Sequence, residues 1–172
     1  PRVRRQRQMC IRDRCKNIPV ADARHITNQD YKPYGCTPLF DAVGSTLVEL
    51  KAIAATHEDA TGIVTIITDG LENASTHYDL EKVVRLIDQM KEMGWTFNFI
   101  GANIDVDMMS NRLHIDNKMA FSSDEEGTGK MFGDLGCCMM AYESERMSQE
   151  ANMSQDERLA FRKKRSKGFF RR

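Results

Sequence analysis

The first clear pattern along the chain is a set of apolar residues that recur every three or four positions between residues 37 and 56. Such spacing places them on one face of a helix. Thr37 followed by Pro38 is typical of a helix start, with Thr as the N-cap and Pro at the first helical position. The sequence therefore predicts a helix from Thr37 to about residue 56, whose buried face is Phe40, Val43, Leu47, Leu50 and Ala54.

A buried strand is predicted at 63–68 (IVTIIT), where β-branched residues follow one another without alternation, as in a strand covered on both faces. Further elements are predicted at 18–26 (weak strand or loop), 79–94 (helix), 95–100 (strand), 105–113 (helix), 118–121 (strand) and from 123 onward (helix). Alternating helices and buried strands predict an α/β fold with a doubly wound, mostly parallel sheet. Such sheets bind ligands beyond the carboxyl ends of their strands.

Charge divides the chain into three parts, although the net charge is zero. Residues 1–16 carry seven Arg and Lys against one Asp, and residues 151–172 carry eight against two acidic residues. The part between them is acidic, which argues against a nucleic-acid-binding face on the domain itself. We expect a disordered or non-native basic arm (1–17), an incomplete α/β domain (18–150) and a basic tail (151–172). The tail could bind an anionic surface, or it could only raise solubility.

The five cysteines include no CxxC pair, and no run of apolar residues is long enough to span a membrane. Ordinary reduced thiols in a cytoplasmic protein are therefore predicted. The chain opens on Pro1 rather than Met, so we expect a fragment from which a leader could be missing.

Candidate chemistry lies in the loop that follows residues 63–68, at Thr68-Asp69-Gly70. A carboxylate at the end of an apolar strand is costly unless something pairs with it. Asp69 and the hydroxyl of Thr37 could supply two oxygen ligands to Mg²⁺, which often takes only one or two carboxylates and keeps several waters. From chemistry alone the alternatives stay open, because Asp before Gly is common in turns and Thr before Pro is common as a helix cap.

The sequences YGCTPLFDAVG, IVTIITDGLEN and WTFNFIGAN together resemble the von Willebrand factor type A (vWA) domain over roughly residues 28–135. The resemblance implies a metal-ion-dependent adhesion site (MIDAS) in which Thr37 and Asp69 hold Mg²⁺ or Mn²⁺. It implies recognition rather than catalysis, since the cation captures an Asp or Glu carboxylate of a protein partner. The residues expected at the rim of this site are Tyr34, Gly70, Leu71, Glu72 and Asn73. A bacterial, cytoplasmic protein is expected on the same ground.

The chain departs from the family because it contains no DxSxS motif, which supplies the remaining protein ligands there. We therefore expect weak metal binding, an unpaired sheet edge and marginal stability. Two other functions stay open. One is a Mg²⁺-dependent phosphotransfer or hydrolytic enzyme that uses Asp69, Asp105 and Asp107, and the other is a metal-free scaffold. The EEGTGK stretch (125–130) lacks the spacing of a phosphate-binding loop.

Overall fold

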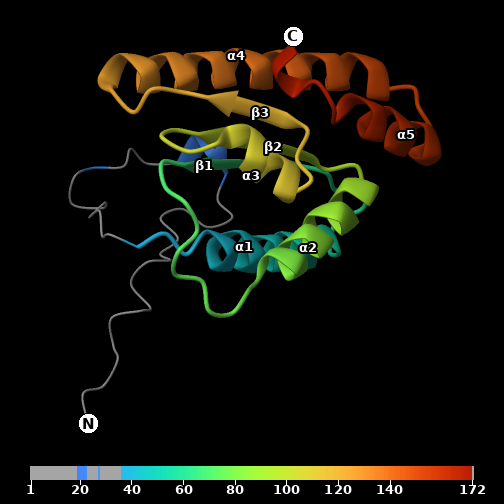
Figure 1. Ribbon diagram of the computed structural model, residues 1–172. Coiled ribbons are helices and arrows are strands. Elements are labelled where there is room, and N and C mark those ends of the chain that lie inside the picture. Colours follow the sequence, from blue (N-terminus) through green and yellow to red (C-terminus); the bar gives the residue numbers. More distant parts are fainter. Residues whose placement is uncertain (1–18, 23–26, 28–35, 172) are drawn as a thin grey trace.

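The computed structural model describes residues 19–22, 27 and 36–171, and Tyr34 and the whole predicted basic arm (1–17) lie outside these residues. The described part is a mixed α/β structure, as the alternating pattern predicts (Figure 1). The strands are β1 (Ile63–Thr68), β2 (Thr96–Gly101) and β3 (Asn117–Ala120). The helices are η2 (Val20–Asp22), α1 (Leu39–Ala54), α2 (Leu80–Glu92), α3 (Val106–Arg112), α4 (Glu125–Glu150), α5 (Gln155–Arg165) and η3 (Phe169–Arg171).

The three strands form one parallel sheet in the order β1-β2-β3. Helices α1 and α2 cover one face of this sheet, and α4 runs across the other face (Figure 1). The central strand β2 is buried at every position, because it has neighbours on both edges and helices on both faces. The two faces of β2 contribute to separate hydrophobic cores. Phe97 and Phe99 pack towards α1 and α2, whereas Ile100 packs under α4.

Two predicted helix starts differ from the observed ones. The N-cap of α1 is Pro38 rather than Thr37, because both backbone polar groups of Thr37 bond to Asn73 instead of starting the helix. The last long helix is capped by Asp124, which accepts a hydrogen bond from the Gly127 amide, and not by Ser123. Asp79, the first residue of the helix predicted at 79–94, caps α2 by accepting a hydrogen bond from the Lys82 amide.

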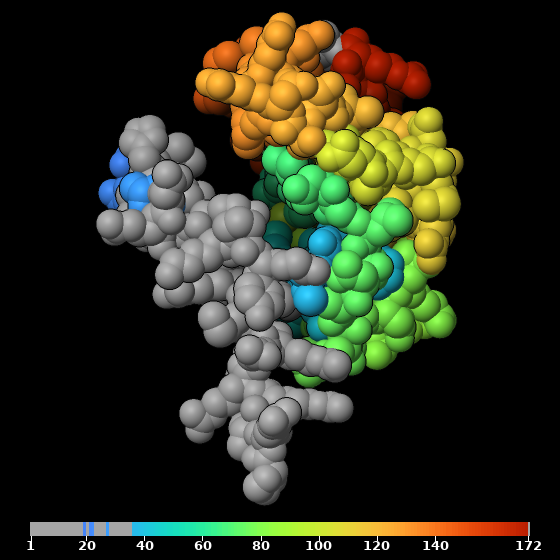
Figure 2. Space-filling view, turned by 60° about the vertical axis from the view of Figure 1, so that its left-hand side comes forward, coloured from blue at the N-terminus to red at the C-terminus, as the bar shows by residue number. Residues whose placement is uncertain are grey.

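The segment predicted as a basic tail (151–172) folds back onto the domain as α5 and η3 over its described residues, 151–171. Figure 2 shows these residues (red) beside α4 (orange) above the rest of the molecule. Ser154 and Glu157 form a capping box that starts α5. Phe169 is fully buried under α4, and the Asn117 side chain accepts hydrogen bonds from the amides of Gly168 and Phe169. Several basic residues of this segment thus meet acidic residues of the body within the fold.

None of the described helices is long and apolar enough to cross a membrane.

Candidate functional site

The loop that follows β1 at the carboxyl edge of the sheet begins with a tight turn. The hydroxyl of Thr68 donates to the carbonyl of Gly70 at 2.8 Å and accepts from the Gly70 amide at 3.2 Å. This turn leaves the Asp69 side chain exposed. The strand before it is less buried than the predicted strand covered on both faces, because only Ile66 and Thr68 of β1 are buried in the described structure. Leu71, one of the predicted rim residues, is also exposed, at 50%.

The same loop lies against the residues that lead into α1. The amide of Thr37 donates to Oδ1 of Asn73 at 2.8 Å, and the amide of Asn73 donates to the carbonyl of Thr37 at 3.1 Å. A Cβ added at Gly70 would lie 2.9 Å from the Thr37 hydroxyl. The Thr37 hydroxyl therefore sits directly beside the residue that follows Asp69, and two segments about 30 residues apart meet at one point.

Glu72 turns inward and organises this loop instead of facing the rim. One carboxylate oxygen accepts from the amides of Ala74 and Ser75 at 2.8 and 2.7 Å, and the other accepts from the Phe40 amide at 2.8 Å and the Ser75 hydroxyl at 2.6 Å. Burial opposes the ionised form, but the bonds from Ser75, Phe40 and Ala74 outweigh it and lower the pKa of Glu72 below its ordinary value. The carboxylate thus ties the loop to the first turn of α1.

Asp41, on the first turn of α1, ties the second half of the loop to that helix. It is 5% exposed, and its carboxylate accepts from the amides of Thr76, His77 and Tyr78 at 2.8, 2.8 and 2.7 Å. Burial alone would raise the pKa of Asp41. The hydrogen bonds from the amides of Thr76, Tyr78 and His77 lower the pKa by more than burial raises it, so the pKa lies below the ordinary Asp value. Three N–H donors to one carboxylate fix the path of the chain from the sheet to α2.

Asp41 and the inward role of Glu72 are the functional features that the sequence analysis missed. The available signal was a charged residue within an apolar helix face, since Asp41 stands between Phe40 and Val43. A second signal was the polar run from Glu72 to Thr76, which is rich in residues that hydrogen-bond to nearby backbone groups.

The other predicted metal ligands are occupied by structural contacts. Asp105 is the N-cap of α3 and accepts from the Met108 amide at 2.8 Å. Asp107 forms an ion pair with Lys118 at 2.6 Å. Residues 125–130 lie inside the first turns of α4 and form no phosphate-binding loop. Within residues 36–171 and the shorter described stretches, no group of three or more His, Cys, Asp or Glu side chains could hold a metal ion.

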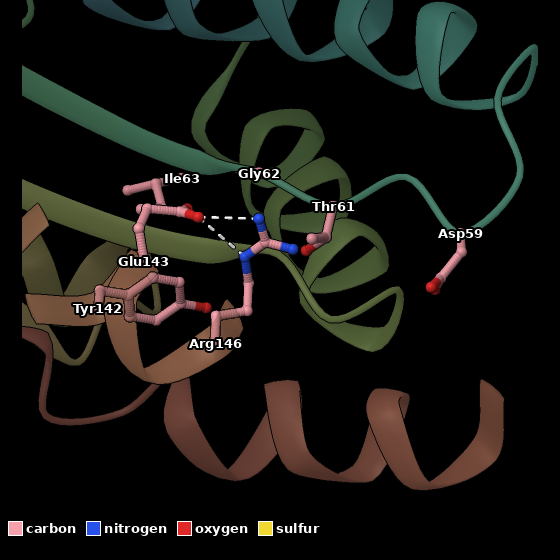
Figure 3. Close-up of a pocket in the computed structure, with 7 residues that line it drawn as sticks. All are labelled: Asp59, Thr61, Gly62, Ile63, Tyr142, Glu143 and Arg146. Atoms are coloured by element: carbon pink, nitrogen blue, oxygen red, sulfur yellow. Dashed lines mark hydrogen bonds and ion pairs between the residues drawn. The ribbon is translucent and has the colours of Figure 1, made fainter. Parts of the chain in front are cut away.

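A cavity of about 240 Å³ lies at the opposite, amino end of β1 (Figure 3). It is bordered by Gly62 and Ile63 on the strand side and by Tyr142, Glu143 and Arg146 of α4. Its polar groups already have partners. Arg146 donates to Glu143 at 2.8 and 3.0 Å, which raises the pKa of Arg146, and the Tyr142 hydroxyl shares a hydrogen bond of 2.9 Å with Thr96.

Beside this cavity, Arg162 of α5 is 4% exposed and joins three distant segments. Its guanidinium donates to both carboxylate oxygens of Glu150 at 2.9 and 2.6 Å and to both of Asp59 at 2.6 and 3.2 Å. The bond to Glu150 raises the pKa of Arg162, although burial opposes the charged form, and the bond to Asp59 raises it further. The network therefore holds the C-terminal helix against the loop that leads into β1.

No family model, curated protein or solved structure matches this chain. The function is therefore inferred from the geometry of these two ends of the sheet and from the resemblance described above.

Proposed function

We propose that this chain is a protein-binding module of the vWA type, in which Thr37 and Asp69 hold a divalent cation that captures a carboxylate of a partner protein. The observation that supports the proposal is that Thr37 lies beside Gly70, the residue that follows Asp69. The Thr37 hydroxyl lies against Gly70, next to the exposed carboxylate of Asp69, although the two come from separate segments.

The donor set fits a hard cation. A hydroxyl and a carboxylate are the oxygen ligands that Mg²⁺ takes, and Mg²⁺ commonly keeps several waters when a protein offers only one or two carboxylates. Bound there, the cation would supply a Lewis-acidic position open to a carboxylate ligand. The hydrogen bonds of Asn73, Glu72 and Asp41 would fix the positions of the segments that carry the Thr37 and Asp69 ligands. With two protein ligands, we expect weak binding of Mg²⁺ or Mn²⁺.

The enzymatic alternative has less support. Asp105 and Asp107 would have to leave a helix cap and an ion pair to serve a metal beside Asp69. Such a step costs the bonds they already make. A metal-free scaffold stays the competing proposal, and the same experiment separates the two.

The test is a titration of the chain with Mn²⁺, followed by electron paramagnetic resonance of the free ion, and competed with Mg²⁺. We expect one weak site that is lost in Asp69→Asn and weakened in Thr37→Val. Asp134→Asn serves as the matched control, because Asp134 is an exposed carboxylate on α4 outside the loop. Equal Mn²⁺ binding by the Asp69 and Asp134 variants, or none by the unmodified chain, would favour the scaffold.

A further inference from the structure

A second cavity, of about 450 Å³, lies between β3 and the first turns of α4, where β3 runs beneath that helix (Figure 1). Its lining includes both apolar and polar side chains: Met119, Phe121, Met131, Ser122, Lys130 and Asp134. The three apolar residues belong to the core under α4 or pack against it. Lys130 and Asp134 carry opposite charges one turn apart on α4, so together they favour neither an anion nor a cation. The cavity is therefore suited to an apolar group.

The register of the sheet places this cavity level with the Asp69 loop. The last residues of the three strands lie opposite one another: Thr68, Gly101 and Ala120. Two hydrogen bonds continue this alignment by one residue, because the Ala102 amide donates to the Thr68 carbonyl at 3.0 Å and the Phe121 amide donates to the Gly101 carbonyl at 3.1 Å. Phe121 therefore lies two strand spacings, roughly 10 Å, from Asp69 along the same edge.

The loop that follows β2 forms the surface between these two points. The Asn103 side chain donates to the Ser123 hydroxyl at 2.9 Å, which joins this loop to the one that follows β3. Asn103 has a φ of 56°, a conformation that Asn adopts more readily than most residues. Both side chains are exposed, and their oxygen and nitrogen atoms match the carbonyl and N–H groups of a peptide backbone. This surface is therefore suited to a segment that crosses from the Asp69 loop to the cavity.

We propose that this cavity is the second half of the partner-binding site and receives an apolar side chain of the partner segment whose carboxylate is held at Asp69. In a polyproline-II segment, residues three positions apart share a face and lie about 9 Å apart, which matches the separation of the two points. The partner segment therefore carries Asp or Glu and, three residues away, an apolar residue such as Leu. The role of the carboxylate rests on the proposed function, whereas binding of an apolar side chain in the cavity requires no metal.

The first test titrates the chain, in the presence of Mg²⁺, with the peptides acetyl-GEPPLG-amide and acetyl-GEPPGG-amide and follows binding by nuclear magnetic resonance. We expect the Leu peptide to bind about five-fold more tightly or better, because its side chain leaves water for the cavity. Moving Leu to two residues from Glu, in acetyl-GEPLPG-amide, should remove most of this gain, since the two side chains then no longer share a face.

Ser122→Trp should abolish the gain from Leu and leave the affinity for the Gly peptide unchanged. Ser122 lines the cavity beside the first turn of α4, since a Cβ added at Gly127 would lie 2.8 Å from its own Cβ. Ser148→Trp is the matched control, because Ser148 is exposed near the other end of α4. Circular dichroism checks that both variants are folded. A gain that both variants keep overturns the inference and leaves the metal site standing, whereas Mg²⁺-independent binding of the Glu peptides contradicts the proposed function instead.

The second test examines the cavity without metal. The methionine methyl groups of the unmodified chain are labelled with ¹³C, and the chain is titrated with acetyl-PPLG-amide and, as the control, acetyl-PPGG-amide. We expect the Leu peptide alone to shift the methyl signals of Met119 and Met131, which line the cavity. The signals of Met108 and Met147, which are exposed on α3 and on the far half of α4, should stay in place. No shift at Met119 and Met131, or an equal shift at all four residues, overturns the inference whether or not the chain binds Mg²⁺.

Discussion

The two ends of the sheet bury charged side chains in different ways. At the carboxyl end, Asp41 is stabilised by backbone N–H groups of Thr76, His77 and Tyr78. At the amino end, Glu150 and Asp59 share the guanidinium of Arg162. The first arrangement uses backbone donors 35 to 37 residues further along the chain from Asp41, whereas the second joins Asp59 to a side chain 103 residues further along.

The two arrangements therefore have different roles: the contacts of Asp41 fix the path of one loop, whereas the contacts of Arg162 hold the C-terminal helix against the domain. Backbone donors cannot be withdrawn without refolding the loop, so a carboxylate bonded to three of them fixes the local path of the chain. A guanidinium bound by two carboxylates instead joins three elements through side chains alone, and it is sensitive to the loss of any one member. We therefore expect damage at the amino end to affect global stability, and damage at the carboxyl end to affect the candidate site as well.

The largest effect is expected from Arg162→Met. Among the described residues, the variant leaves Glu150, which is 8% exposed, with its longer contact to Arg146 at 3.5 Å. Removing one partner of a buried ion pair costs about 3–5 kcal/mol, because the remaining charge stays buried without adequate compensation. We expect a loss at the lower end of this range, since Arg146 still opposes part of the charge. Unfolding in urea, followed by circular dichroism, measures the change in free energy.

Arg85→Met is the control for that experiment, since Arg85 pairs with Glu81 on the exposed surface of α2. An exposed pair of this kind contributes about 0.3–0.5 kcal/mol. The double variant Arg162→Met with Glu150→Leu should regain part of the loss, because it removes the carboxylate that lost its partner. Equal small losses in the Arg162 and Arg85 variants would show that the buried network contributes no more than a surface pair.

A smaller loss, about 2 kcal/mol, is expected from Asp41→Asn, since the amide can accept from only some of the three backbone donors and brings N–H groups of its own against them. Hydrogen exchange should report it locally, as faster exchange of the Thr76, His77 and Tyr78 amides. Asp79→Asn makes the matching change at a helix cap, where Asn is as good an acceptor as Asp, and it should leave stability unchanged. Uniformly faster exchange across the whole sheet would contradict a local role.

Acid should weaken the contacts that Asp41 and Glu72 make at the carboxyl end. The pKa values of Asp41 and Glu72 are lowered in the folded state, so their stabilising contribution is present above their unfolded pKa values and is lost as the pH falls through the lower, folded ones. The window therefore opens below about pH 4. The pKa of Arg162 is raised, so its guanidinium keeps its charge throughout this acid range. The difference in unfolding free energy between the original chain and Asp41→Asn should shrink from pH 7 to pH 3. A constant difference would mean that Asp41 is not ionised in the fold.

The sequence predicts the helices and strands at both ends of the sheet, but not the side-chain contacts that join distant segments there. The strand at 63–68 and the helices after Asp79 and Asp105 follow from periodicity and capping, which are local signals. Thr37 and Asp69 could be assigned to one edge because parallel strands end together. The bonds from Asp41 to residues 76–78 and from Arg162 to Asp59 connect distant segments, and no local pattern specifies them. The sequence likewise predicts only a basic tail at the C-terminus, since a run of basic residues does not reveal which acidic residues it meets.

The smallest effects should come from adding one methyl group at each end. Gly62 lies at the amino end, where an added Cβ would come within 2.6 Å of the Trp95 ring. The ring is 6% exposed and has little room to move, so Gly62→Ala should cost about 1 kcal/mol or slightly more through overpacking.

At the carboxyl end, an added Cβ at Gly70 would lie 2.9 Å from the Thr37 hydroxyl, its nearest neighbour. A hydroxyl at the edge of the structure can rotate away, so Gly70→Ala should cost less than about 0.5 kcal/mol. The displaced hydroxyl, however, is one of the two proposed ligands, and Mn²⁺ binding should fall to the level of Thr37→Val. Gly62→Ala, with its larger loss of stability, should keep Mn²⁺ binding unchanged. If both alanine variants lost stability equally and neither altered Mn²⁺ binding, the two ends would not differ in function, because the position of the Thr37 hydroxyl would matter only for packing.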